Sequence, residues 1–385
     1  MTAPLKIMLV AAEASGDALG AGLAKSLKIH NTDVAFVGVG GPKMAAEGVV
    51  SPFDIAQLSI LGWIEGLRAY DRVKARVADT VALAVRERPD AVVLIDSWGF
   101  TIRVAKALRQ ALPGVPLIKY VGPQVWASRP GRAKTLAATV DHLLALYSFD
   151  APWFEAEGLP TTVVGSPALH IDMTQADGDR FRQARNIAPD APLLLVLPGS
   201  RPSEIGHMTP VYEAAVARLK AADPALQVAV VVAGTVAEDV TARVATWPFR
   251  VHLAPEADKY DAMRAATVAL ATSGTVSTEL ALAGVPMVIA YRFGALSYAI
   301  MKPFFTGKFA TLFNTAADAM IAPELIQKDA TPDKLAAAVA RLLSDPAARA
   351  DQSARQTAAL DLMGREGRDP SEIAAEAVLK ITTRR

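Results

Sequence analysis

The chain has 385 residues, of which 52% are hydrophobic and 21% charged, and this composition excludes an intrinsically disordered protein. Forty basic residues balance thirty-nine acidic ones, so no global field attracts nucleic acid or an anionic membrane. The absence of cysteine excludes disulfides, thiolate nucleophiles and cysteine-ligated zinc. Single hydrophobic cores stop growing near roughly 250–300 residues, so this length predicts two domains.

The N-terminal segment 5–12 is apolar but runs directly into Glu13 and Asp17. It lacks the basic flank and the cleavage site of a signal peptide, and it predicts a first strand instead. No stretch reaches the roughly 18–20 continuous apolar residues that a membrane-spanning helix needs. We therefore expect a soluble protein, at most peripheral to a membrane.

Short runs rich in β-branched residues alternate with helical patterns along the first half of the chain. This alternation is typical of parallel sheets joined by crossover helices. The predicted strands are 7–11, 34–39, 91–95, 117–121, 142–146 and 162–164. The predicted helices include 19–28, 73–86 and 102–112.

The alternation breaks at 165–179, where Pro167 and Gly178 indicate an interdomain linker. It then restarts, and a helical region runs from Pro332 to the end of the chain. The predicted strands of this half are 193–197, 228–232, 250–253, 268–271 and 287–290. Two α/β domains of this kind place ligands at the loops that follow their strands, in a cleft between the domains.

The first such loop contains Glu13, Ser15 and Gly16. The Glu13 carboxylate can accept hydrogen bonds from sugar hydroxyls, and the amides of Ser15 and Gly16 could face a bound polar group. Ser15 and Asp17 fit equally well as helix N-caps, with Gly16 in a tight turn. The sequence leaves both interpretations open.

The predicted strand 91–95 ends in Asp96, where the chain leaves the sheet. A carboxylate at this place is suited to act as a general base. The alternative is an N-cap for a helix that begins near Thr101, but Asp96 lies several residues too early for a cap. We therefore favour a catalytic Asp96.

A third loop, 120–132, combines aromatic side chains, arginines and backbone-bending residues. Aromatic faces and guanidinium groups bind sugars and phosphates. Gln124, Trp126 and Arg129 are the candidate substrate-binding residues of this loop.

In the second half, Gly199, Ser200 and Arg201 follow a predicted strand and precede a helix. Exposed amides next to a guanidinium could cradle a diphosphate. The alternative is a polar turn capped by Ser200. The loop lacks the Walker A spacing of ATP- and GTP-hydrolysing proteins. A separate glycine-rich turn at 38–41 is not a dinucleotide-binding fingerprint, because Lys43 replaces its third glycine.

Ser273, Gly274 and Thr275 open another helix after a strand, and Glu279 follows on the same helical face. The amides could hold a phosphate while Glu279 binds ribose hydroxyls. A glutamate inside a helix is more often a solvated surface residue. The binding role of Glu279 is therefore supported mainly by the neighbouring loop.

Five motifs in chain order resemble those of lipid-A-disaccharide synthases, glycosyltransferases of bacterial lipopolysaccharide biosynthesis. The match covers nearly 300 residues. The motifs are E-A-S-G-D at 13–17, V-G-P-Q-V-W at 121–126, L-P-G-S-R at 197–201 with Glu204, S-G-T at 273–275 with Glu279, and P-M-V-I-A-Y-R at 286–292.

The resemblance implies an α/β fold of two Rossmann-like domains facing a central cleft, the GT-B type. It implies an acceptor-side domain at 1–168, a UDP-sugar-binding domain at 169–362 and a C-terminal helix at 363–385 that returns to the first domain. Catalytic roles fall on Asp96 and Glu13. Glu204, Arg292 and Asn314 join the substrate-binding residues named above, and neither metal nor cofactor is implied.

The implied reaction is inverting. The 6-hydroxyl of 2,3-diacylglucosamine 1-phosphate, lipid X, attacks UDP-2,3-diacylglucosamine, giving the β-1,6-linked lipid A disaccharide 1-phosphate and UDP. Two motifs differ on the acceptor side. The family commonly reads I-D-x-P-D-F-N around the catalytic aspartate, whereas here Gly99 replaces the second carboxylate and Thr101 the asparagine. In the second motif, Ser166 replaces the histidine of G-H-P.

The acylated substrates imply a cytoplasmic protein that contacts the inner membrane peripherally on its cytoplasmic face. The apolar stretches 58–64 and 298–305 could provide that contact, with Lys302 and Lys308 near lipid phosphates. Each stretch also fits a core helix. The sequence does not fix the oligomeric state, and a homodimer stays open.

Two alternatives remain at this point. One is another UDP-sugar enzyme of the same fold, an epimerase or an N-acetylglucosaminyltransferase, because a fold does not determine the substrate. The E-A-S-G-D loop argues against the epimerase and against the N-acetylglucosaminyltransferase. The other is a sugar-nucleotide-binding protein that has lost turnover.

Overall fold

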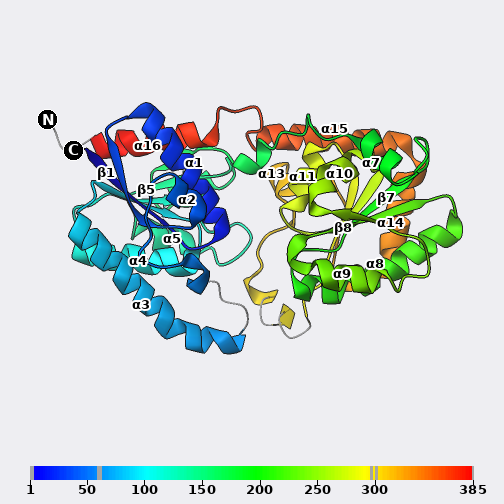
Figure 1. Ribbon diagram of the computed structural model, residues 1–385, viewed down its shortest axis with the longest axis horizontal. Helices are drawn as coiled ribbons and strands as arrows, with labels where there is room; N and C mark the ends of the chain where they lie inside the picture. The colour runs from blue at the N-terminus through cyan, green and yellow to red at the C-terminus, as the bar shows by residue number, and fades with distance from the viewer. Residues whose placement is uncertain (1–3, 59–62, 295–297, 300–301, 384–385) are drawn as a thin grey trace. The chain divides into compact units, whose positions relative to one another are not determined.

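The computed structural model describes residues 4–58, 63–294, 298–299 and 302–383. The chain forms two compact units, Met1–Pro167 with Glu366–Arg385, and Ala168–Arg365. Each unit contains one parallel six-stranded sheet covered by helices (Figure 1). The predicted α/β class and its parallel sheets are confirmed.

The N-terminal unit has the strand order β2-β1-β3-β4-β5-β6. Its strands are β1 Leu5–Ala11, β2 Val34–Val39, β3 Ala91–Ile95, β4 Leu117–Tyr120, β5 His142–Ala145 and β6 Thr161–Val163. Its helices are α1 Ala14–His30, α2 Pro42–Ala46, α3 Trp63–Glu87, α4 Trp98–Ala111, α5 Arg132–Ala137, α6 Ala151–Glu155 and α16 Pro370–Thr383.

The inner strands of this sheet are buried on both faces, which explains why β1 and β3 read as continuous apolar runs rather than as alternating patterns. On one face, Met8 and Leu94 pack with residues of α3, α4 and α5. On the other face, Ile7 and Val93 pack with residues of α1, α2 and α16.

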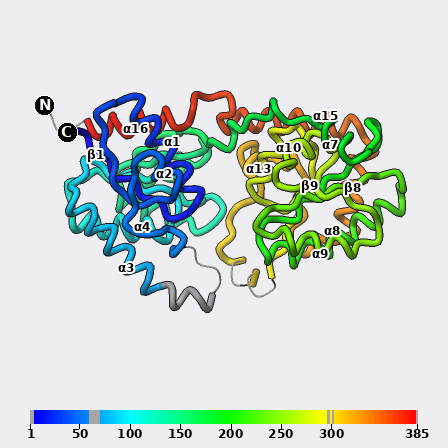
Figure 2. Tube along the Cα trace, viewed as in Figure 1, coloured from blue at the N-terminus to red at the C-terminus, as the bar shows by residue number. Residues whose placement is uncertain are grey.

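The last helix, α16, belongs to the N-terminal unit although it ends the chain. It packs against α1, and both views show the red C-terminal segment beside blue α1 (Figures 1 and 2). Ala374, Ala375 and Val378 of α16 are fully buried. The sheet face that α1 covers is therefore also covered by residues from the end of the chain.

The C-terminal unit has the strand order β12-β11-β10-β7-β8-β9. Its strands are β7 Leu193–Leu197, β8 Gln227–Val232, β9 His252–Pro255, β10 Val268–Thr272, β11 Met287–Tyr291 and β12 Glu324–Ile326. Its helices are α7 Gly178–Ala184, α8 Pro202–Ala222, α9 Ala237–Val244, α10 Lys259–Ala265, α11 Val276–Leu282, α13 Leu312–Ala316, α14 Pro332–Ser344 and α15 Pro346–Leu362.

Several element boundaries differ from the sequence-based expectations, among them the start of α3 at Trp63 rather than at 73. Helix α4 begins at Trp98 rather than at 102, and α1 begins at Ala14 rather than at 19. Helix α7 begins inside the expected linker, because the Asp177 side chain accepts hydrogen bonds from the amides of Asp179 and Arg180. The Asp177 cap is a local polar contact without apolar periodicity, so the hydrophobic pattern did not reveal this helix start. Helices α1 and α4 begin without a side-chain cap.

Strand β12 is a further difference, since the sequence analysis did not predict it. Its three residues are half-buried and lack a strong apolar run. It joins the sheet only through pairing with β11, which tertiary contact provides.

Among the described residues, no helix is both long and apolar enough to cross a membrane. Of the two apolar stretches expected at a membrane surface, residues 59–62 and 300–301 lie outside the described part of the chain.

Candidate active site

Asp96 lies at the carboxyl end of β3, in the turn before α4. The residue is half-buried, and its Oδ2 accepts a 2.9 Å hydrogen bond from the Ser15 hydroxyl. The N-cap of α4 is Ser97, so Asp96 precedes the cap position. Its carboxylate therefore does not cap this helix, and it is held instead by a residue 81 positions away.

The loop between β1 and α1 brings Glu13, Ser15 and Gly16 to the same edge of the sheet. Glu13 is the N-cap position of α1, and it is exposed along with Ser15. A Cβ added to Gly16 would lie 3.2 Å from the Ala11 Cβ and 3.7 Å from the Asp96 Cβ. A glycine here allows the first turn of α1 to approach Asp96 closely.

Asp17 has a different task from the cap of its own helix that the sequence suggested. It is 2% exposed, and its two carboxylate oxygens accept hydrogen bonds of 2.8–3.0 Å from the amides of Gly41, Lys43 and Met44. Asp17 therefore caps the N-terminus of α2, whereas α1 starts without a side-chain cap.

A pocket of about 720 Å³ lies beside the Asp96 turn within the N-terminal unit. Its lining includes both polar and apolar side chains. Arg103 contributes a cation to this wall, and its guanidinium donates to the Gly99 carbonyl. The lining includes Glu13, Ser15, Leu58, Tyr70, Val73, Ser97, Trp98, Gly99, Phe100 and Arg103.

Gln124, Trp126 and Arg129 lie in the loop after β4 and outside this described lining. The Trp126 indole donates a 2.8 Å hydrogen bond to the Asp150 carboxylate and contacts the Phe149 ring edge-on at 5.5 Å. Gln124 and Arg129 are exposed. Trp126 thus anchors the loop, while its neighbours remain accessible.

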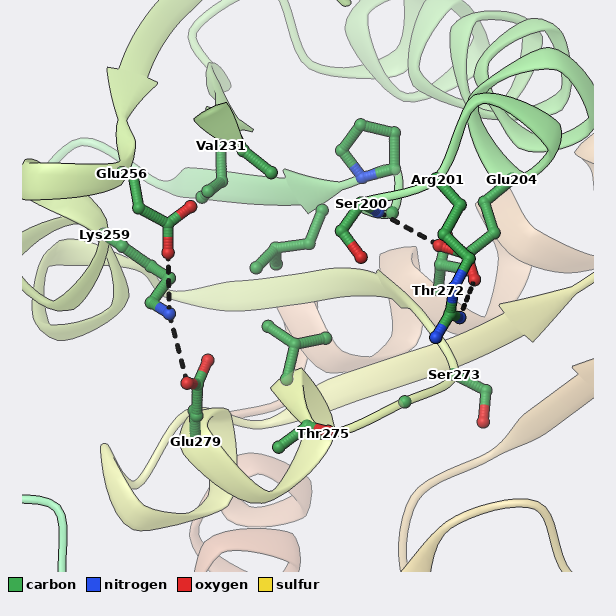
Figure 3. A pocket seen from close by; sticks show the side chains of 16 residues that line it. Ser200, Arg201, Glu204, Val231, Glu256, Lys259, Thr272, Ser273, Thr275 and Glu279 are labelled. Carbon is green, nitrogen blue, oxygen red and sulfur yellow. Dashed lines mark hydrogen bonds and ion pairs between the residues drawn. The ribbon is translucent and has the colours of Figure 1, made fainter. Parts of the chain in front are cut away.

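A second pocket, of about 280 Å³, lies wholly within the C-terminal unit at the carboxyl ends of its strands (Figure 3). It brings together residues of the loops after β7, β9 and β10. The lining includes Gly199, Ser200, Arg201, Glu204, Glu256, Lys259, Ser273, Gly274, Thr275 and Glu279. Eight of these ten are sequence-predicted residues from two separate motifs, and the fold joins them in one pocket.

Arg201 and Glu204 form one end of this pocket, next to Ser273 (Figure 3). The Arg201 guanidinium donates to the Glu204 carboxylate at 2.8 Å and keeps 75% of its side chain exposed. Glu204 is buried and also accepts the Ser200 amide at 3.0 Å. The Ser200 side chain is not the cap of α8, because the N-cap position is Arg201.

Gly199 is required by the conformation of this loop. Its φ of +119° is one that other residues rarely adopt, and an added Cβ would lie 2.6 Å from the Glu204 carboxylate. The Gly199 backbone and the Glu204 side chain thus pack tightly under the loop. In this pair Glu204 is the buried partner and the guanidinium of Arg201 is the exposed one.

The other end of the pocket carries a row of three charges, Glu256, Lys259 and Glu279 (Figure 3). The Lys259 ammonium lies 3.0 Å from Glu256 and 3.1 Å from Glu279. Burial lowers the pKa of Lys259, but the two carboxylates outweigh burial and raise it. Glu279 is 9% exposed and also accepts from Tyr260 at 3.3 Å, so it is no solvated surface residue.

The sequence analysis missed Glu256 and Lys259. Glu256 follows β9 directly and Lys259 begins the next helix, α10, and this position after a predicted strand is the signal that could have identified them. They were overlooked because no motif marks the loop.

Arg292 and Asn314 lie outside the described lining of the pocket. Arg292 follows β11 and is half-buried. Asn314 is fully buried, and its amide group bonds to Ala322, Ile321 and the Glu324 carboxylate. Asn314 therefore organises the loop around Glu324 rather than presenting its amide to solvent.

Within the described part of the chain, no three histidine, aspartate or glutamate side chains are placed to hold a metal ion. The cations available to an anionic ligand in the C-terminal pocket are Arg201 and Lys259.

Comparison with known families agrees with the order of motifs along the chain. The profile of the lipid-A-disaccharide synthetase family matches residues 7–378. A lipid-A-disaccharide synthase of Rhodospirillum centenum is 46% identical over 384 residues, covering 99% of this chain and 96% of the relative. The chain belongs to the lipid-A-disaccharide synthase family. It is accordingly a glycosyltransferase of lipid A biosynthesis, and the resemblance drawn from five motifs is confirmed.

Other relatives and solved structures extend this picture of the synthase family. The synthase of Paramagnetospirillum magneticum is 43% identical and covers 97% of this chain and 96% of its own. The glycosyltransferase of kitacinnamycin matches the structure with a TM-score of 0.63 at 18% identity, covering 98% of this chain and 99% of its own. The UDP-GlcNAc 2-epimerase of Neisseria meningitidis, bound to UDP-GlcNAc, matches with 0.62 at 12% identity, covering 99% of this chain and 100% of its own. These structures share the GT-B fold with the synthase family, and the epimerase alternative is not favoured.

Proposed function

We propose that this chain joins UDP-2,3-diacylglucosamine to the 6-hydroxyl of 2,3-diacylglucosamine 1-phosphate. The products are the β-1,6-linked disaccharide 1-phosphate and UDP. The observation that carries the proposal is Asp96, a half-buried carboxylate held by Ser15 beside a pocket lined by polar and apolar side chains.

In the proposed reaction Asp96 takes the proton from the acceptor hydroxyl as the oxygen attacks the anomeric carbon. The bond from that carbon to the diphosphate breaks, and its electron pair leaves with UDP. Attack from the opposite face converts the α-linked donor into a β-linked product. We assign Glu13, at the same edge of the sheet, the role of accepting hydrogen bonds from sugar hydroxyls.

The leaving diphosphate is assigned to the C-terminal pocket. Arg201 supplies an exposed guanidinium suited to two phosphate oxygens, and the exposed backbone of Gly274 and Thr275 lies in the same pocket. Glu279 uses its Oε1 for Lys259 and Tyr260, and we assign its Oε2 to a ribose hydroxyl.

The acyl chains of the acceptor are assigned to the apolar side chains of the N-terminal pocket, which include Leu58, Val73 and Phe100. Because both proposed substrates are acylated, we place the reaction at the cytoplasmic face of the inner membrane. The exposed Phe304 and Phe305 of the C-terminal unit suit such a contact.

The test is an assay of purified protein with both acylated substrates, in which UDP release and disaccharide formation are followed. Stoichiometric formation of both products supports the proposal. UDP binding without product would refute it. In a parallel assay with UDP-N-acetylglucosamine, an epimerised product without UDP release would support the epimerase alternative.

Asp96→Asn tests the assigned base. Loss of general base catalysis is expected to lower kcat by about 10²- to 10⁴-fold, while the dissociation constant for UDP stays within twofold. Equal turnover in the variant would remove Asp96 from the mechanism.

A further inference from the structure

A charged side chain is buried directly beneath the turn that carries Asp96. Lys119, the third residue of β4, is 2% exposed. Its ammonium donates hydrogen bonds to the Asp96 main-chain carbonyl and, at 3.0 Å, to the Thr101 hydroxyl. A buried ammonium loses its hydration, so these contacts must compensate for that loss. The Asp96 carbonyl lies at the start of the turn that leads into α4, and the Thr101 hydroxyl lies at its end.

The turn itself has an unfavourable backbone conformation. Asp96 and Ser97 have φ values of +50° and +38°, a region that residues with a Cβ seldom occupy, and here two such residues are consecutive. Such a conformation persists only where surrounding contacts hold it. The Asp96 amide donates to the Tyr120 carbonyl at 2.9 Å, and the Thr101 hydroxyl lies 2.8 Å from the Asp96 carbonyl.

The position is a poor one for a cation if only helix stability mattered. Lys119 contacts the first turn of α4, where the helix dipole is positive. The carboxylates that act on it are those of Asp96, after β3, and Glu13, after β1. Burial lowers the pKa of Lys119 to about 7, against the opposing effect of these two carboxylates. Its charge therefore changes near neutral pH, next to the assigned base.

We propose that Lys119 is a positioning residue for glycosyl transfer. Its side chain ties the Asp96 carbonyl to Thr101 and so holds the strained turn in the conformation that directs the Asp96 carboxylate towards the acceptor hydroxyl. Lys119 exchanges no proton with the substrate. This inference rests on the proposed function of Asp96 as the general base.

Lys119→Met tests the inference, because methionine preserves most of the volume and removes all donors. We expect kcat to fall about 10- to 100-fold, since small displacements of a reacting group reduce the rate by such factors. We expect UDP affinity to stay within twofold, because the proposed UDP pocket lies in the other unit. The urea midpoint of unfolding should change little, because the variant loses both the desolvation cost of the buried ammonium and its hydrogen bonds.

The pH profile of kcat separates positioning from a merely structural role. Both forms of Lys119 have enough donors for the Asp96 carbonyl and the Thr101 hydroxyl, but only the ammonium form makes charge-assisted hydrogen bonds to them. Wild-type kcat is therefore expected to decline as the pH rises above about 7. Lys119→Met should abolish this decline. A decline that persists unchanged in the variant belongs to another group and overturns the inference.

Thr101 provides a second and milder pair of variants. Thr101→Val removes the hydroxyl at nearly constant volume and is expected to lower kcat, whereas Thr101→Ser keeps the hydroxyl and should restore most of it. If Lys119→Met fails to fold, this pair still decides, because equal turnover in the valine and serine variants would overturn the inference.

Wild type and Asp96→Asn are assayed in the same series. A wild type that forms no disaccharide refutes the proposed function. An active wild type with an inactive Asp96→Asn and a Lys119→Met whose kcat lies within twofold of wild type overturns only the positioning role.

Discussion

Arg201 is the residue on which the assignment of the diphosphate depends most directly. Its guanidinium is exposed in the pocket and paired with the buried Glu204. A hydrogen bond to a charged group contributes about 1.5–3 kcal/mol, so Arg201→Ala should weaken UDP binding by about 10- to 150-fold. Solvent around the exposed guanidinium favours the lower end.

Isothermal titration with UDP measures this loss. Arg218→Ala is the matched control, because Arg218 lies on α8, the helix that Arg201 precedes, and pairs with Asp333 outside the pocket lining. Equal UDP affinities of the two variants would place the diphosphate elsewhere.

Asp150 gives the N-terminal unit a specific pH dependence. Burial raises its pKa to about 6, against the opposing hydrogen bonds from Trp126 and the backbone at Tyr147. The folded state thus retains a proton that the unfolded state loses near pH 4, so the stability contributed by Asp150 is full below pH 4 and falls as the pH rises to about 6. The expected loss is on the order of 3 kcal/mol.

Urea unfolding of wild type and Asp150→Asn between pH 4 and pH 8 checks this sign. The amide mimics the protonated acid, so wild type should lose stability relative to the variant from pH 4 to about pH 6 and remain level above it. A difference that does not change with pH would contradict the assigned pKa.

At the scale of elements, the start of α2 depends on a residue of α1. Asp17 accepts three amide hydrogens at that start and is itself buried. Asp17→Ala leaves those amides without their acceptor, and we expect the free energy of unfolding to fall by about 2 kcal/mol or more.

The measurement is urea unfolding at pH 7. Asp33→Ala, at an exposed position after α1, should change stability by less than about 0.5 kcal/mol. If the two variants were equally stable, Asp17 would have no role as a cap of α2.

At the scale of the whole molecule, the proposed reaction draws its residues from both units. The lining of the proposed nucleotide pocket comes entirely from Ala168–Arg365, whereas Asp96 and its supporting residues belong to the other unit. A ligand that binds only the folded state stabilises the unit that holds it, by about 2.7 kcal/mol at a hundredfold excess over its dissociation constant.

Hydrogen exchange with and without UDP tests this division. Added UDP should protect amides of residues 198–204 and 272–279, and should leave residues 12–17 and 95–101 nearly unchanged. Protection confined to the second pair of segments would assign the nucleotide to the N-terminal unit.

The sequence by itself determined the fold class, most strands and the loops that matter. Strands buried on both faces are continuous apolar runs, and the loops that follow them carry the polar residues. The local pattern alone therefore predicts β3 with Asp96 and β7 with Arg201. The E-A-S-G-D and L-P-G-S-R motifs added the family, which no periodicity could supply.

Only the tertiary structure decided which of these residues meet and what each side chain contacts. Ser15 reaches Asp96 across 81 positions, and Lys119 reaches it from a neighbouring strand. In the sequence, Lys119 is a single charged residue in an apolar strand, and only the structure shows that its side chain is buried. Such contacts depend on strand order and register, which arise from packing of the whole sheet, and so they leave no local pattern in the sequence.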